Sequence, residues 1–219
     1  MTRTITVKGT GKVSAAPDYV VITMKLETKE AAYDVTMESA AHKIAAINKS
    51  LEAIGFKANS VKTTNFDVRT NYDHIKDRNG NYKSVFCGYA CYHHLKVEFD
   101  FDTKRLAKAL YAVSKCPAQP EIAVSFTVKD PSAVSKELLR TATVNAREKA
   151  EILCEASNVT LGSLLSIDYN WGELSVVSKT EYILEEKCLS LPCSGLADVD
   201  FVPDDIDVND TATFVWEIR

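Results

Sequence analysis

Two hydrophobic periods follow one another along this chain of 219 residues, and the first limits the fold most. Within residues 4–26 the apolar side chains alternate with polar ones on both sides of a break, at Ile5, Val7, Val13, Val20, Ile22, Met24 and Leu26. A period of two is typical of strands with one buried face. Pro17-Asp18 interrupts the run because proline cannot donate to a strand ladder, so two strands joined there are predicted. Gly9 and Gly11 lie on the face of Val7, where a missing side chain allows a bend or a close neighbour.

The second period predicts two long helices. Between residues 31 and 54, apolar positions recur at alternating intervals of four and three, at Tyr33, Met37, Ala40, Ile44, Ile47, Leu51 and Ile54. This stripe predicts a helix that packs on the sheet and stops at Gly55. A helix interface between subunits is the alternative, since a spacing near 3.5 also suits coiled coils. The second long helix, 131–157, opens at Asp130-Pro131 and stops at Asn158. Its inner face is rich in alanine and can lie close to a neighbour, with Leu138, Ala142, Ala146, Ala150, Leu153 and Ala156.

The remaining pattern predicts shorter elements and an irregular region. A long hairpin is expected from strands 61–72 and 85–99, with Asn79-Gly80 in its loop. A short helix over 103–114 follows Asp102 as its cap, and further strands are expected at 121–128, 164–170 and 206–218. Residues 171–204 are predicted to be an irregular excursion with one strand near 176–184.

These elements predict an α+β fold, with an antiparallel-rich sheet and two long helices packed on it. A β-α-β-β order occurs twice, which predicts a structural pseudo-repeat. The first set is strand 19–28, helix 31–54 and strands 61–72 and 85–99; the second is strand 121–128, helix 131–157 and strands 164–170 and 206–218. We expect one domain over 1–219, with sub-units 1–100 and 101–219.

Composition excludes several classes of function. The chain is 46% hydrophobic and 26% charged, which is ordinary for a globular protein with a core. A net charge of −4 gives no electrostatic support for nucleic-acid binding. No apolar run approaches the roughly 20 residues of a membrane helix, so no membrane insertion is expected. Met1 lies directly before the first strand without a leader, which predicts a cytoplasmic protein; a periplasmic one from which a leader was removed is the alternative.

The strongest candidates for chemistry lie on the strand predicted over 85–99. Cys87, Cys91 and His93 share one face of that strand, and His94 faces the other way. At about 3.3–3.4 Å per residue, the two cysteines are roughly 13 Å apart and cannot both ligate one zinc ion. Cys91 and His93, roughly 7 Å apart by the same rise, would need two more ligands from elsewhere. Packing in the core is the favoured interpretation, and a metal or redox site is the alternative.

Other polar groups favour structural roles. Cys188 and Cys193 are expected to be free thiols in the cytoplasm, or a local disulfide in an oxidising compartment. An acidic run fits no EF-hand loop and predicts a solvated edge that discourages aggregation; its members are Asp198, Asp200, Asp204, Asp205, Asp207 and Asp210. Arg147 and Glu151 can pair across one helical turn. We therefore predict no catalytic, cofactor-binding or metal-ligating residues, and no cofactor.

Several short segments occur in a recognisable order along nearly the whole chain. They are Ile5–Val13 with Pro17-Asp18, Leu51-x-x-Ile54-Gly55-Phe56, Val61-x-Thr63, Gly88-Tyr89-x-Cys91, Ala142-x-x-x-Ala146-Arg147-x-Lys149-Ala150-Glu151 and Leu161-Gly162. Together they resemble the SIMPL domain family, largely uncharacterised bacterial proteins with exported immunogenic and oxidative-stress-associated members. Many relatives carry a signal peptide, whereas none is expected from the residues before the first strand here, and Pro203-Asp204-Asp205 stands where relatives tend to have Pro-Gly.

The resemblance implies a function without established catalytic residues. Some relatives form large ring-like oligomers, which implies a homo-oligomer here. We expect a non-enzymatic protein that acts through self-assembly or contacts with other proteins, and the resemblance alone implies envelope or oxidative-stress physiology. A small-ligand or metal-binding protein that uses the Cys91/His93 strand and residues 171–204 is the alternative, and an enzyme is the third.

Overall fold

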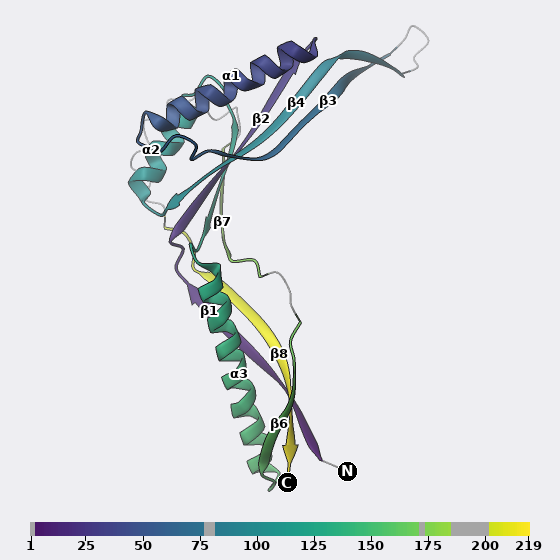
Figure 1. Cartoon of the computed structure of the whole chain (residues 1–219), viewed down its shortest axis with the longest axis vertical. Coiled ribbons are helices and arrows are strands. Elements are labelled where there is room, and N and C mark those ends of the chain that lie inside the picture. Colours follow the sequence, from purple (N-terminus) through teal and green to yellow (C-terminus); the bar gives the residue numbers. More distant parts are fainter. Residues whose placement is uncertain (1–2, 77–81, 171–173, 185–201) are drawn as a thin grey trace. The chain divides into compact units, whose positions relative to one another are not determined.

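The computed structural model describes residues 3–76, 82–170, 174–184 and 202–219 and confirms the predicted α+β class. Its strands form two antiparallel sheets, and its helices pack on them. The chain divides into two compact units that are interleaved along the sequence (Figure 1). The two-helix unit comprises Tyr19–Phe126 and Thr180–Val202, and the one-helix unit comprises Met1–Asp18, Thr127–Lys179 and Pro203–Arg219. The unit boundary therefore does not fall at residue 100. One family domain over 1–219 stays a prediction.

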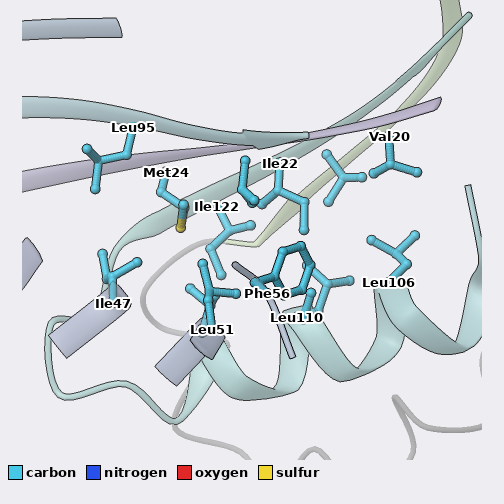
Figure 2. Packing of buried hydrophobic residues seen from close by; sticks show 14 of the residues in the cluster. Val20, Ile22, Met24, Ile47, Leu51, Phe56, Leu95, Leu106, Leu110 and Ile122 are labelled. Atoms are coloured by element: carbon cyan, nitrogen blue, oxygen red, sulfur yellow. The ribbon is translucent and has the colours of Figure 1, made fainter. Parts of the chain in front are cut away.

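The two-helix unit is built on a five-stranded sheet with the order β3-β4-β2-β5-β7. Its elements are β2 (Tyr19–Glu30), α1 (Tyr33–Glu52), β3 (Lys62–Lys76), β4 (Tyr82–Asp100), α2 (Thr103–Ser114) and most of β5 (Glu121–Thr127) and β7 (Val177–Leu184). Alternate residues of β2 are fully buried, as the period of two predicts. Figure 2 shows these side chains meeting others from α1, α2, β4 and β5 in one core. Ala40, Ile47 and Leu51 of the α1 stripe are buried within this unit, which confirms packing on the sheet.

Helix boundaries follow local signals in the sequence. The side chain of Asp102 accepts a hydrogen bond from the amide of Arg105, so it caps α2 as predicted. Asp130 caps α3 in the same way, directly before a proline at the first helical position. Gly55 and Asn158 both have positive φ, of 94° and 55°, just after α1 and α3, and this confirms both predicted stops. None of the described helices is long and apolar enough to span a membrane.

The one-helix unit is a three-stranded sheet, β1-β8-β6, with one long helix packed on it. Its elements are β1 (Thr4–Ala15), α3 (Pro131–Ala156), β6 (Leu161–Asp168) and β8 (Ile206–Ile218). β8 is central and antiparallel to both neighbours, so that Val7 lies opposite Phe214. The predicted inner face of α3 is buried at Leu138, Ala142, Ala146 and Ala150. The prediction is wrong at Leu153, which is 50% exposed, and at the exposed Ala156, because Cys154 takes the buried position in the last turns of the helix.

The two glycines of β1 allow α3 to lie very close to the strand. A Cβ atom added to Gly9 would overlap the carbonyl oxygen of Ala142 and lie 2.7 Å from the Cβ of Ala146. A Cβ added to Gly11 would overlap the carbonyl oxygen of Leu138. The close neighbour predicted at these glycines is therefore the backbone of α3, and the alanines of that helix are its matching surface.

The predicted pseudo-repeat is wrong in its second half. β5 pairs in the five-stranded sheet, whereas β6 and β8 belong to the three-stranded sheet. The strands of the first set lie in the order β2-β4-β3, so the pseudo-repeat predicts the order β5-β8-β6 for the second set. The observed order is β1-β8-β6, in which β1 from the beginning of the chain lies where β5 was predicted. The reason is that the glycines of β1, rather than its position in the chain, let it pack under α3.

Candidate interaction surfaces

Cys91 and His93 both lie on β4, and their side chains are buried inside the two-helix unit. They are 1% and 5% exposed, as the core interpretation predicts. Nε2 of His93 lies 2.9 Å from the hydroxyl oxygen of Thr63, and its ring packs edge to face against Phe66 at 4.9 Å between centroids. Nδ1 of His93 is buried and has no hydrogen-bond partner among the described residues.

Burial keeps both of these groups neutral. It lowers the pKa of His93 below the ordinary 6.5, and electrostatic repulsion from the neighbouring His94 imidazole lowers it further. Burial also raises the pKa of the Cys91 thiol, and the carboxylate of Asp67 adds to this effect. A thiol is a nucleophile and a metal ligand as the thiolate, so this environment disfavours both roles for Cys91.

The buried imidazole makes stability depend on pH. His93 binds a proton more readily in the unfolded chain, near the ordinary pKa of 6.5, than in the folded chain, where its pKa is lowered. Stability is therefore lost as the pH falls below about 6.5, by at most about 1.4 kcal/mol per pH unit for a single proton. Urea denaturation at pH 7.5 and 5.5 measures this loss. We expect His93→Gln to reduce the difference between the two pH values.

The control for this titration is the exposed His42 on α1, whose side chain is 78% exposed. His42→Gln is expected to leave the pH dependence of the wild-type protein unchanged. An equal loss of stability on acidification in wild-type and His93→Gln proteins would show that this histidine does not carry the effect.

The other sequence candidates do not join Cys91 and His93. Cys87 is exposed and lies at a register shift, where Asn71 pairs with Gly88 and Tyr72 with Phe86. The period of two therefore does not continue from Cys91 to Cys87. Within the described ranges, no three His, Cys, Asp or Glu residues come together as a metal site would require.

The remaining predicted groups are placed as follows. Cys188, Cys193, Asp198, Asp200 and the turn Asn79-Gly80 lie outside the described residues. Arg147 and Glu151 form the predicted pair at 2.9 Å. Asp210 accepts a hydrogen bond from the hydroxyl of Tyr169 at 2.6 Å, which raises the pKa of that tyrosine. The described part of the acidic run thus includes a carboxylate that fixes local structure.

A row of partly exposed aromatic side chains distinguishes the hairpin of β3 and β4. Figure 1 shows the two strands continuing past the amino-terminal end of α1. Four rings contact one another edge to face in the order Tyr33, Tyr89, Phe86 and Tyr72, with centroids 5.5–5.7 Å apart. Tyr33, Phe86 and Tyr72 are 53%, 47% and 51% exposed. Tyr82, at 69%, adds aromatic surface on the face of the hairpin that carries Tyr72 and Phe86. We call these five residues the hairpin surface.

Gly88 sets the geometry of the hairpin surface. It has φ of 131°, and a Cβ there would overlap the carbonyl oxygen of Glu30 and lie 2.9 Å from the Cα of Ala31. The hairpin therefore passes directly against the turn between β2 and α1. The extra residue at this point moves Phe86, which strict alternation assigns to the other face, into contact with Tyr89.

A second apolar surface lies in the one-helix unit, along β6. Leu164, Leu165 and Ile167 are 46%, 51% and 55% exposed. Between β6 and α3 there is a shallow groove of about 370 Å³. Its lining includes Phe214 and Trp216, whose rings stack at 5.5 Å. Exposed apolar surfaces of this kind are typical of protein-interaction sites and ligand-binding grooves.

Comparison with known proteins bears on the family of this chain. Curated protein sequences give no significant match to this chain. A family model does match it, over residues 5–216 and hence over nearly its whole length, and the family is described as a protein of unknown function (DUF541). The matched residues include nearly all of β1 and β8 and the whole of α3 and of the hairpin strands. The chain therefore belongs to the SIMPL family.

Proposed function

We propose that this chain is a non-enzymatic protein that acts through self-assembly, within the wider class of proteins that work by contacts with other proteins. The observation that carries the proposal is the hairpin surface, a continuous aromatic row left partly exposed. Cys91 and His93 are buried and neutral, which supports a structural role for these two residues. A setting in envelope or oxidative-stress physiology is proposed from the family resemblance alone.

The size of the hairpin surface supports a contact between proteins. An aromatic side chain contributes about 150–250 Å² when it is fully buried. Tyr33, Tyr72 and Phe86 are each about half exposed and Tyr82 more so, which leaves roughly 400 Å² of aromatic surface for a partner to cover. This is about half of the roughly 800 Å² that each side of a standard interface provides.

Removing two rings of the row tests the proposal. The double variant Tyr72→Ser/Phe86→Ser is expected to lower the mass of the assembly in solution, because it removes the centre of the apolar contact. Size-exclusion chromatography with light scattering, over a range of protein concentrations, measures that mass against the 24.2 kDa of one chain. The folded structure is expected to remain, since both side chains are about half exposed.

The matched control is Tyr111→Ser on α2, because Tyr111 is as exposed as Tyr72, at 51%, but lies outside the hairpin surface. Its mass is expected to equal that of the wild-type protein. A wild-type chain that stays at 24.2 kDa at every concentration would overturn the proposal. Such a monomer with a tightly bound small molecule or metal would point to a ligand-binding protein instead.

A further inference from the structure

The outer edge of β6 is unpaired in the described part of the chain. β8 lies on one side of β6, and no other described strand lies on the opposite side. The backbone N–H and C=O groups along such an edge are a template for another strand. Along this edge the side chains of Leu164, Leu165 and Ile167 are about half exposed.

The residues that usually protect a sheet edge are missing from β6. β1, the other edge of the same sheet, carries exposed Lys8 and Lys12 and is followed by Pro17. The sequence of β6, Leu161–Asp168, contains no lysine, arginine or proline, and its one charged residue is the last. Lysine and proline on edge strands are common means of preventing edge-to-edge pairing. β6 therefore lacks the lysine and proline residues that distinguish β1.

The register of β6 makes it complementary to itself. Leu164 lies opposite Trp216 and Ile167 opposite Phe214, with a register shift between them. Both side chains therefore lie on the face of the sheet that α3 covers, although they are three residues apart. In an antiparallel pair of two copies, Leu164 of each copy can lie opposite Ile167 of the other. Asp168 then faces the uncharged Ser163 of the second copy, so no like charges meet.

We propose that β6 pairs antiparallel with β6 of a second copy of this chain, so that two three-stranded sheets become one sheet of six. The contact is isologous, because the same strand serves both copies. This inference rests on the proposed self-assembly and adds a second surface to it. The hairpin surface alone can join two chains, whereas a chain with two separate contacts can join assemblies larger than a dimer.

A lysine on the edge strand tests this pairing. Ile167→Lys puts a charge at the centre of the contact and is expected to reduce the wild-type assembly to a pair of chains held by the hairpin surface. Tyr72→Ser/Phe86→Ser is expected to leave a pair held by β6, and the three substitutions combined are expected to give a single chain of 24.2 kDa. Native mass spectrometry resolves these species.

The matched control is Ile152→Lys on α3, because Ile152 is 63% exposed and does not line the groove beside β6. Its mass is expected to equal that of the wild-type assembly. Circular dichroism checks that each variant is folded, and Leu165→Lys, at a similarly exposed edge position, provides a second test should Ile167→Lys unfold.

The outcomes separate the two proposals. If the hairpin variant lowers the mass and folded edge variants do not, the pairing of β6 is overturned while self-assembly stands. The antiparallel register is tested by mixing Leu165→Cys and Ser166→Cys chains under mild oxidation. The register is supported if the mixture gives more disulfide-linked dimer than either variant alone or the wild-type chain gives. A wild-type chain that is always a monomer overturns both proposals.

Discussion

Replacing Gly9 by alanine is expected to lower the free energy of unfolding of the one-helix unit by about 3 kcal/mol, the upper end of the usual cost of overpacking. The added Cβ would overlap the carbonyl oxygen of Ala142 and lie 2.7 Å from the Cβ of Ala146. Neither atom belongs to a flexible side chain, so α3 itself must move away from β1. Hydrogen exchange measured by mass spectrometry should show faster exchange in both elements.

Thr6→Ala is the control for this prediction, because Thr6 is on the same strand but has an exposed side chain. It is expected to change stability by less than about 0.5 kcal/mol, as is usual for surface positions. Exchange in α1 serves as an internal reference, since that helix packs in the other core. Unchanged protection of α3 in the Gly9→Ala protein would show that the strand and helix are less closely packed than described.

Leu110→Ala is expected to destabilise the two-helix unit by about 2–5 kcal/mol, because it removes a fully buried side chain and leaves a cavity. Leu110 lies on α2 among side chains from the sheet and from α1, as Figure 2 shows. The surrounding core draws on five elements, so it cannot collapse onto the space by moving one of them. Urea denaturation followed by circular dichroism measures the shift.

The adjacent residue provides a strict control. Tyr111→Ala removes a larger side chain from the same helix, but Tyr111 is 51% exposed. Alanine raises the helix propensity in both variants, and by a few tenths of a kcal/mol more where it replaces tyrosine, so a loss of about 2–5 kcal/mol confined to Leu110→Ala reports burial. Equal losses of stability in Leu110→Ala and Tyr111→Ala would contradict the assigned core.

Local structure could be predicted from the sequence because its signals are local. The alternation in β2 and the caps at Asp102 and Asp130 need only a few neighbouring residues to be interpreted. The same holds for the helix stops at Gly55 and Asn158, where positive φ is tolerated. The extent of each helix follows from these signals together with the apolar stripe.

The partner of each strand was harder to predict, because it depends on residues far apart in the chain. Sequence order placed β5 beside β6 and β8, but β1 lies there instead. Two separate segments of the sequence carried the signal for this pairing. Gly9 and Gly11 leave room on a strand, and the alanines of α3 provide a flat surface that fits such room. Matching the two would have indicated that β1 packs under α3.

The interaction surfaces could be predicted only in part, because periodicity does not show which strands lie at an edge or which faces stay uncovered. Strict alternation placed Phe86 on the face opposite Tyr89, and the bulge at Gly88 reverses this. Leu164, Leu165 and Ile167 have the composition of core residues, yet they are about half exposed because β6 ends the sheet. The lack of lysine and proline in β6 was the signal that could have identified this edge.

Native mass spectrometry of the wild-type chain tests the central claim of self-assembly most directly, because it reports the number of chains and any bound species together. The predicted spectrum shows assemblies of two or more chains, each at a multiple of 24.2 kDa and with no additional bound mass. A single species at 24.2 kDa that retains a small molecule or metal ion would contradict self-assembly and identify a ligand-binding protein.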